Sequence, residues 1–272
     1  MGWGLPRLRD LPWRRTRDPW AILVSEVMLQ QTQAARVIPK WRQFMSAYPT
    51  AAGCASAALG DVLRLWQGLG YPRRAKNLHD AAAEIARLGR FPQTLDELRR
   101  LPGVGAYTAR AVMAFAFEVD CAVVDTNIAR VLARLAGTRL TARQVQANAD
   151  ELVPAGESWA WNQCLMDLGA TVCRPANPNC AECPLAASCA WHGEGAEDPA
   201  IGSAGVSGRQ ARFDGSDRQA RGLLLQALVN APIGSERVAT VMRCDESRAA
   251  RLVADLEREG LVVRRERMLR LP

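Results

Sequence analysis

Apolar residues recur at spacings of three and four over most of this chain. From Pro19 to about Ala190 the pattern is helical, and the short breaks between runs are marked by Gly or Pro. The clearest helical runs are 20–32, 61–66, 75–88, 94–101, 108–117, 126–135, 142–152 and 159–170. Because the alternation typical of strands is absent from this part, the pattern predicts a mainly α fold.

The composition changes after the helical part. Residues 193–216 are rich in Gly, Ala, Ser and Asp with few large apolar side chains, which is typical of a linker. Three helical runs follow at 217–231, 235–242 and 246–260, and 261–272 has a strand-like pattern that predicts a terminal β-hairpin. This order of elements is typical of a winged helix, with a generic three-helix cap as the alternative.

The 272 residues suffice for two or three domains, and their net charge is +7. This charge suggests a polyanionic partner without proving one. Of the 35 basic residues only Lys40 and Lys76 are lysines. A mechanism that needs a nucleophilic lysine therefore has two candidates.

Two further features bear on location. No run of about 18 uncharged apolar residues exists, which excludes a membrane span. Residues 1–17 contain five arginines and lack the apolar core of a secretory signal. We therefore expect a cytoplasmic protein, in which clustered cysteines indicate a metal more often than disulfides.

Four of the eight cysteines follow the spacing C-x6-C-x2-C-x5-C, namely Cys173, Cys180, Cys183 and Cys189. Four thiolates on one short, proline-rich stretch suit either tetrahedral zinc or an iron–sulfur cluster. Zinc sites favour two C-x2-C pairs, so the unequal spacing favours a cluster, and two disulfides remain an alternative. The other four are predicted to be small buried hydrophobes: Cys54, Cys121, Cys164 and Cys244.

The stretch L-P-G-V-G at 101–105 lies between two helical runs. Glycines here permit positive φ and let the N–H groups at a helix N-terminus approach a phosphate. The candidate DNA-contacting residues are Gly103, Val104, Gly105 and Thr108. A tight turn between two helices is the alternative.

Glu26 is the only charged residue in the apolar run 20–32. Its neighbours one turn away are mostly apolar: Ile22, Leu23, Leu29 and Gln30. A carboxyl held on such a face has a raised pKa and can act as a general acid. A solvent-exposed glutamate at the edge of the helix is the alternative.

Asp125 follows an apolar segment and precedes the helical run 126–135, so a plain N-cap is an equally good interpretation. The helix dipole and backbone N–H groups of such a site keep an aspartate ionised. An anion there could stabilise a cationic sugar. With Glu26 raised and Asp125 lowered in pKa, the two carboxyls would divide the acid and stabilising roles.

The cysteine spacing and the L-P-G-V-G stretch together resemble the endonuclease III and MutY superfamily of helix-hairpin-helix DNA glycosylases. Residues 25–33 (S-E-V-M-L-Q-Q-T-Q) and 123–131 resemble its MutY branch, and the resemblance covers roughly 11–192. It implies a two-lobed helix-hairpin-helix glycosylase fold with a [4Fe–4S] cluster held by the four cysteines. The implied domains are a six-helix barrel at 15–121, a cluster domain at 1–14 and 122–192, the linker at 193–216 and the winged-helix-like domain at 217–272.

The resemblance also implies roles for single residues. Glu26 would protonate adenine at N7, and Asp125 would stabilise the oxocarbenium-like sugar. Tyr107 and Asn127 fall on catalytic-pocket positions, and Tyr71 in G-L-G-Y falls on a wedge that enters the DNA stack. The substrate-binding positions are Trp13, Arg14, Leu29, Gln31, Tyr71 and Gln163.

Position 107 distinguishes two branches of the superfamily. Bifunctional members have a lysine there that forms a Schiff base with the sugar, whereas this chain has Tyr107. A phenol cannot form that imine, so we expect base excision without AP-lyase activity.

The chain departs from the usual MutY pattern in its C-terminal part. The tail is too short and too helical for the nudix-like β domain, as in shorter actinobacterial-type MutY homologues, and Pro72 replaces a second aromatic after Tyr71. The resemblance implies a monomer that removes adenine mispaired with 8-oxoguanine or guanine from double-stranded DNA. A thymine or uracil mismatch glycosylase of the same fold and a non-catalytic iron–sulfur DNA-binding protein are the alternatives.

Overall fold

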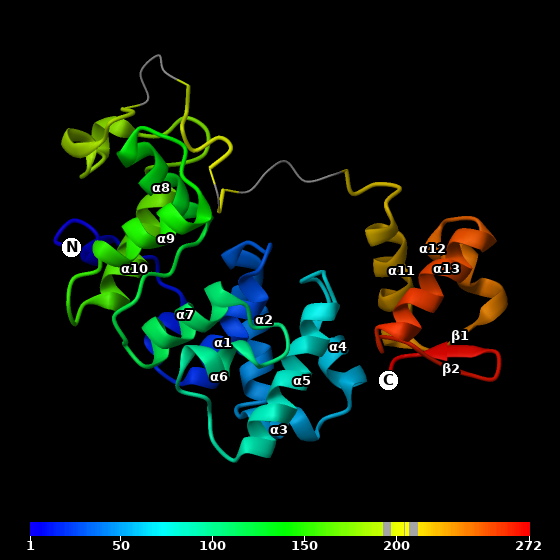
Figure 1. The fold of residues 1–272 in the computed structure, drawn as a ribbon. Coiled ribbons are helices and arrows are strands. Elements are labelled where there is room, and N and C mark those ends of the chain that lie inside the picture. The colour runs from blue at the N-terminus through cyan, green and yellow to red at the C-terminus, as the bar shows by residue number, and fades with distance from the viewer. Residues whose placement is uncertain (193–196, 204, 207–211) are drawn as a thin grey trace. The chain divides into compact units, whose positions relative to one another are not determined.

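The computed structural model describes residues 1–192, 197–203, 205–206 and 212–272 (Figure 1). The chain forms two compact units, each built from segments that are distant in sequence. The first unit comprises 1–22, 93–99 and 104–209, and the second comprises 23–92, 100–103 and 210–272.

The first unit is helical. Its helices are α6 (Leu95–Arg99), α7 (Ala106–Ala116), α8 (Thr126–Ala136), α9 (Ala142–Glu151) and α10 (Ser158–Thr171). Short 3-10 helices occur at Leu5–Arg7, Pro12–Arg15, Cys180–Glu182 and Ala186–Ser188. Helix α10 packs against α8 and α7, which places the buried face of α8 in the core of this unit.

The second unit contains α2 (Ala34–Ala47), α3 (Ala51–Ser56), α4 (Leu59–Trp66) and α5 (Arg73–Leu88). Helix α1 (Pro19–Leu29) begins in the first unit and continues into the second. It is apolar all round apart from Ser25 and Glu26, and such a helix is buried. Leu23, Val24 and Met28 are fully enclosed.

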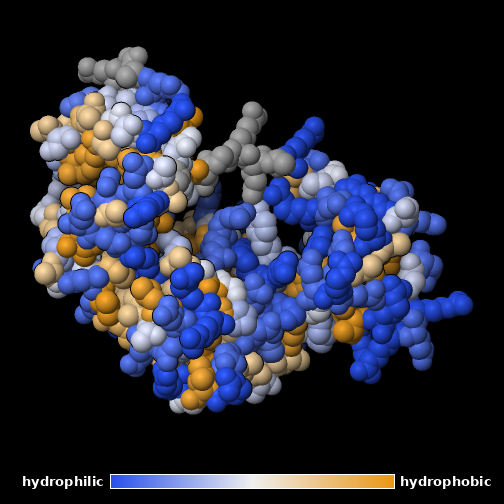
Figure 2. Space-filling view, viewed as in Figure 1, coloured by the Kyte–Doolittle hydropathy of each residue, from blue (hydrophilic) through white to orange (hydrophobic). Residues whose placement is uncertain are grey.

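The C-terminal elements also belong to the second unit. They are α11 (Asp217–Asn230), β1 (Ile233–Gly234), a 3-10 helix (Ser235–Arg237), α12 (Val238–Met242), α13 (Glu246–Arg258), β2 (Val263–Arg265) and β3 (Met268–Arg270). The three strands form an antiparallel sheet in the order β1-β3-β2, in which Leu269 of β3 is opposite Ile233 on one side and Arg264 on the other. Figure 2 shows a largely hydrophilic surface over these elements.

The mainly helical fold predicted from the apolar spacing is confirmed. The helical runs did not include α2 and α3. Helix α2 contains Pro39, which is unfavourable inside a helix, and α3 is only six residues long. Within the described residues, no helix is both long and apolar enough to cross a membrane.

Part of the predicted linker at 193–216 lies outside the described residues, namely 193–196, 204 and 207–211. Its described residues near 200 are packed. Ala200 and Ser203 are buried, and the Ser203 hydroxyl accepts a 3.0 Å hydrogen bond from the Leu140 N–H. Asp198 forms an ion pair with Arg134 of α8 at 2.7 Å. This segment therefore belongs to the first unit.

Candidate active site and cysteine pocket

Glu26 lies on α1 and is 5% exposed, so it is not the solvated glutamate of a helix edge. The residues one turn before it, Ile22 and Leu23, are buried as well. Leu29, the last residue of α1, is half-buried, and Gln31 just beyond it is exposed. The acid predicted from the sequence is therefore buried on a largely apolar helix, and burying the ionised form of a carboxyl is costly.

The C-terminal end of α1 is held by Arg74, a buried residue of α5 that the sequence analysis did not single out. Burial lowers the pKa of Arg74 to about 10, so its guanidinium remains charged at neutral pH. Its Nη1 and Nη2 atoms donate to the carbonyls of Val27 (2.9 Å), Met28 (3.0 Å), Gln30, Leu69 (2.9 Å) and Gly70 (3.2 Å) and to Thr32 Oγ1 (3.1 Å). Arg74 thereby joins the end of the Glu26 helix to the loop 68–71.

Two of the predicted substrate-binding positions, Gln31 and the wedge Tyr71, have unusual backbone conformations. Gln31 has φ 55° and Tyr71 has φ 48°, in the left-handed region that side chains other than glycine rarely adopt. Such a residue costs on the order of 1 kcal/mol and persists where its surroundings hold it. Arg74 supplies that support, since it bonds backbone carbonyls next to both residues and its Cζ lies 5.4 Å from the Tyr71 ring centroid.

Asp125 is the N-cap of α8, as its position in the sequence predicts. Its Oδ1 accepts from the N–H groups of Asn127 (2.9 Å) and Ile128 (2.7 Å), and its Oδ2 accepts from Asn127 Nδ2 (2.8 Å). Burial nevertheless raises the pKa of Asp125, although these hydrogen bonds and the charge of Arg130 oppose the shift. The prediction of a lowered pKa is wrong, because desolvation outweighs the groups that favour the anion.

Asn127 connects Asp125 to Arg130, a second buried arginine that the sequence analysis did not single out. Arg130 Nη2 donates to Asn127 Oδ1 at 2.8 Å and to the Gly169 carbonyl at 2.6 Å. Its Nε donates to the carbonyl of Cys173 at 2.7 Å. A continuous set of hydrogen bonds therefore runs from Asp125 to the backbone of the first clustered cysteine.

Arg14 and Gln163, both predicted to bind substrate, are buried and bonded to each other, with Arg14 Nε 2.6 Å from Gln163 Oε1. Arg14 also makes a two-pronged ion pair with Asp167, with both N–O distances 2.8 Å. Burial alone would raise the pKa of Asp167, but hydrogen bonds from Arg14 and Arg9 lower it. Trp13 beside Arg14 is buried too, so this set ties the Pro12–Arg15 turn to α10.

The predicted hairpin contains two exposed glycines, Gly103 and Gly105. Gly103 has φ 76°, and a Cβ there would lie 2.7 Å from the Asn77 side chain, so only glycine fits. Gly105 caps α7 without a side chain, as a phosphate-binding helix start requires. Val104 and Thr108 are buried, Thr108 with 3% exposure, so the glycine backbone and not these side chains forms the exposed part of the motif.

Tyr107 is half-buried on the first turn of α7. The side chain at this position of the hairpin motif is therefore a phenol and not an amine. Lys40 and Lys76, the only lysines of the chain, belong to α2 and α5, outside this motif.

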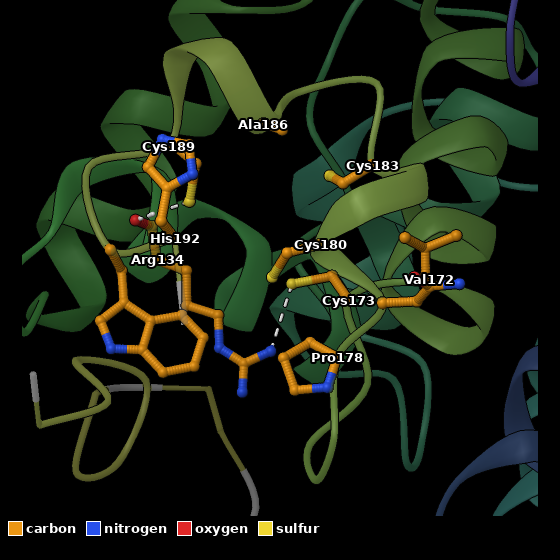
Figure 3. Close-up of a pocket in the computed structure, with 11 residues that line it drawn as sticks. Arg134, Val172, Cys173, Pro178, Cys180, Cys183, Ala186, Cys189 and His192 are labelled. Carbon is orange, nitrogen blue, oxygen red and sulfur yellow. Dashed lines mark hydrogen bonds between the residues drawn. The ribbon is translucent and has the colours of Figure 1, made fainter. Parts of the chain in front are cut away.

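The four clustered cysteines line one pocket (Figure 3). Arg134 also lines it, and its Nη1 donates to Cys173 Sγ at 3.3 Å. The Arg134 guanidinium lies 4.5 Å from the Trp191 ring centroid. Among the described residues, no three Cys, His, Asp or Glu converge as a single-ion metal site.

The remaining cysteines lie elsewhere. Cys54 and Cys164 are buried as predicted, whereas Cys121 and Cys244 are only half-buried. Burial raises the pKa of Cys54 to about 12 and that of Cys121 to about 11, so both thiols stay protonated at neutral pH.

Comparison with known proteins places this arrangement in a family. Residues 24–155 match the family described as "HhH-GPD superfamily base excision DNA repair protein". An adenine DNA glycosylase of Mycolicibacterium smegmatis is 41% identical over 263 residues, which cover 93% of this chain and 88% of the relative. The chain belongs to the HhH-GPD superfamily, as a MutY-type member.

Solved structures agree with this membership. A thermostable thymine-DNA glycosylase aligns with a TM-score of 0.66 and 33% identity, over 70% of this chain and 91% of that one. An endonuclease III in a non-covalent complex with DNA aligns with a TM-score of 0.62 and 26% identity, over 69% of this chain and 89% of that one. These likenesses confirm the HhH-GPD fold and support DNA as the partner.

Within this MutY-type chain, each unit contains one predicted carboxyl: Glu26 in the second and Asp125 in the first. The residues that sequence reasoning missed are arginines that anchor the predicted ones: Arg9, Arg74 and Arg130. A signal existed for two of them, because Arg130 interrupts a face of small and apolar residues in the run 126–135 and Arg74 directly precedes the run 75–88. Their partners could not be read from the pattern.

Proposed function

We propose that this enzyme removes adenine mispaired with 8-oxoguanine or guanine from double-stranded DNA in base excision repair. The observation that carries the proposal is the buried carboxyl of Glu26 on an apolar helix. Adenine leaves deoxyribose poorly unless a ring nitrogen is protonated, and a buried carboxyl holds its proton for that step. The base must first leave the duplex, which costs a few kcal/mol of unstacking.

Asp125 supplies the second chemical role, stabilisation of the positively charged sugar. As the glycosidic bond breaks, positive charge develops on the sugar, and the ionised Asp125 carboxylate stabilises it. Asn127 and two backbone N–H groups of α8 hold the carboxylate in one orientation. Because burial raises the pKa of Asp125, the reaction requires a pH above that pKa. Water then completes the hydrolysis, and with Tyr107 at the lysine position the DNA backbone stays intact.

The four-cysteine pocket fits an iron–sulfur cluster, as the family implies. All four thiols line one pocket, and Arg134 directs an N–H at Cys173 Sγ, as is common around thiolate ligands. Cys173, Cys180, Cys183 and Cys189 would hold a [4Fe–4S] group. Bound there, it would supply four iron–thiolate bonds that close the loop next to α8. The hydrogen bonds of Arg130 then connect this loop to Asn127 and Asp125.

The cluster has a direct spectroscopic test. Purified protein should be brown, with broad visible absorption, and Cys180→Ser should lose that absorption. Cys244→Ser is the matched control and should keep it, since Cys244 lies in the C-terminal elements. A colourless wild type that contains zinc would contradict the assignment.

We further propose a division into a six-helix barrel at 15–121 and a cluster domain formed by 1–14 and 122–192. A linker at 193–216, partly outside the described residues, would lead to a winged-helix-like domain at 217–272. Three helices and an antiparallel three-stranded sheet, whose first strand β1 lies between α11 and α12 in the chain, support the last assignment. We propose a monomer that acts on DNA at the nucleoid.

A duplex panel tests the function. Adenine, thymine or uracil is placed opposite guanine, 8-oxoguanine or cytosine, and strand breaks are scored with and without alkali. We expect breaks only after alkali, and only for adenine opposite 8-oxoguanine or guanine. Breaks without alkali would contradict the absence of lyase activity.

The same panel tests a second candidate, a thymine or uracil mismatch glycosylase. The alignment with a thymine-DNA glycosylase at 33% identity favours it, and Tyr107 and Asp125 suit that chemistry equally. Excision of thymine opposite guanine with adenine left intact would establish it. The buried Glu26 and the capped Asp125 argue against a third reading, a non-catalytic DNA-binding protein, which would need neither.

A further inference from the structure

The loop 68–71, which carries the expected wedge Tyr71, contacts an arginine of the C-terminal elements. Arg218, on the first turn of α11, donates from Nη1 to the Tyr71 hydroxyl at 3.1 Å. Its Cζ also lies 5.9 Å from the centroid of the Tyr71 ring and 5.2 Å from that of Phe213. The guanidinium therefore lies near two aromatic rings, an arrangement favourable to a cation.

This contact is part of a wider packing within the second unit. Helix α11 packs against α4, and the Gly60 N–H of α4 donates to the Pro272 carbonyl at 2.9 Å. Helix α4 itself supports the loop, because the indole N–H of its last residue, Trp66, donates to the Gly70 carbonyl at 3.0 Å. The C-terminal elements thus meet the barrel helices at the base of the wedge loop.

Two guanidinium groups hold this loop in different ways. Arg74 bonds the carbonyls of Leu69 and Gly70 and so supports the backbone. Arg218 bonds the hydroxyl, at the far end of the Tyr71 side chain. The backbone contact fixes where the side chain begins, and the hydroxyl contact restricts its rotation about χ1 and χ2.

We propose that Arg218 is a positioning residue for Tyr71, so that the C-terminal domain takes part in opening mispaired DNA. The inference rests on the proposed function, because the wedge role of Tyr71 belongs to it. A ring already held in one orientation loses less conformational freedom when it inserts between bases. The helix α11 in this way assists a step that precedes base excision.

The test uses the full chain and a duplex in which 8-oxoguanine pairs with a non-cleavable 2′-fluoro adenosine. A 2-aminopurine next to that pair reports unstacking as a rise in fluorescence. We expect Arg218→Ala to weaken binding about fivefold to tenfold, in line with the net contribution of one ordinary hydrogen bond, and to reduce the fluorescence rise at saturation. Tyr71→Phe, which removes only the acceptor, should act in the same direction.

A double variant that combines Arg218→Ala with Tyr71→Phe tests whether Arg218 acts through the Tyr71 hydroxyl. If Arg218 acts through the Tyr71 hydroxyl, Arg218→Ala should add little to Tyr71→Phe. Arg218→Lys should recover part of the loss, since lysine keeps the charge and a donor. Arg221→Ala is the matched control on the same helix, because Arg221 pairs with Glu259 inside the C-terminal domain at 2.5 Å, and it should match the wild type.

Three results would overturn the inference while the proposed function stands: an Arg218→Ala protein equal to the wild type, losses that add fully in the double variant, or tighter binding after Arg218→Ala. Tyr71→Phe and Arg218→Lys keep the test valid should Arg218→Ala fold poorly, as thermal unfolding would show. A wild type that excises no adenine and unstacks no mispair would overturn both the proposed function and this inference.

Discussion

Glu26 and Asp125 are both desolvated carboxyls, but different local structures hold them. Glu26 is buried on α1, a helix whose other residues are apolar except Ser25, and its position follows from the helical periodicity of α1. Asp125 accepts three hydrogen bonds at the start of α8 and lies near the charge of Arg130. An acid needs surroundings that disfavour its anion, whereas a stabilising carboxylate needs groups that hold the anion in place.

The comparison extends to the arginine that anchors each helix. Arg74 bonds mainly backbone carbonyls, at the end of α1 and in the loop 68–71, and its Cζ lies 5.4 Å from the Tyr71 ring centroid. Arg130 bonds Asn127, which in turn bonds Asp125. Loss of Arg74 should therefore affect folding and the wedge loop, while loss of Arg130 should affect the titration of Asp125.

The largest effect is expected for Glu26→Gln. This change keeps the shape of the side chain but removes its acid, so single-turnover excision of adenine should fall on the order of a thousandfold or more. Binding to the mispaired duplex should stay close to that of the wild type, as measured by fluorescence anisotropy. Retained excision would refute the role of Glu26 as the acid.

Asp125→Asn should have the next largest effect. The amide keeps an acceptor for the N–H groups of α8 but removes the negative charge, so excision should fall about a hundredfold to a thousandfold. Asp120→Asn is a matched control, because Asp120 is exposed and accepts from the Gly156 N–H at 2.9 Å. Equal losses of excision rate in the two variants would show that the negative charge of Asp125 has no specific role in excision.

Arg74→Ala should lower the free energy of unfolding by about 2–4 kcal/mol, because buried carbonyls lose a charged donor. Chemical denaturation measures this loss. Arg73→Ala, the exposed neighbour in α5, should change stability little. A similar small change for Arg74→Ala would mean that water replaces the guanidinium at no cost.

Arg130→Ala should give the smallest and most specific change. The charge of Arg130 opposes the raised pKa of Asp125, so its removal raises that pKa further. Asp125 then becomes protonated at a higher pH, and the excision rate should decline at a higher pH as the medium is acidified. Single-turnover excision rates measured across a range of pH give the acidic decline of the rate. Arg143→Ala is the control, because Arg143 is exposed. An acidic decline at the same pH as in the wild type would show that Arg130 does not influence the pKa of Asp125.

Local patterns in the sequence predicted much of this protein. The apolar face around Glu26, the N-cap at Asp125 and the single loop of four cysteines involve neighbours within a turn or a short loop. The elements that local pattern missed are short or interrupted: α2 with Pro39, the six-residue α3 and the two-residue β1. In α3 and β1 the periodic signal is too brief to stand out, whereas in α2 the proline interrupts a helix of 14 residues.

Tertiary structure alone decided the properties that depend on residues far apart in the chain. Arg74 reaches a carbonyl 47 positions away, Arg130 one 39 positions away, and Arg9 a carboxylate 158 positions away. The pKa of Asp125 also depends on residues far apart in the chain. Its hydrogen-bond donors are local and favour the anion, but the desolvation that outweighs them comes from whatever the whole fold packs around it. The sequence pattern identifies the hydrogen-bond donors of Asp125. Only the folded chain determines how much water is excluded from its carboxyl group.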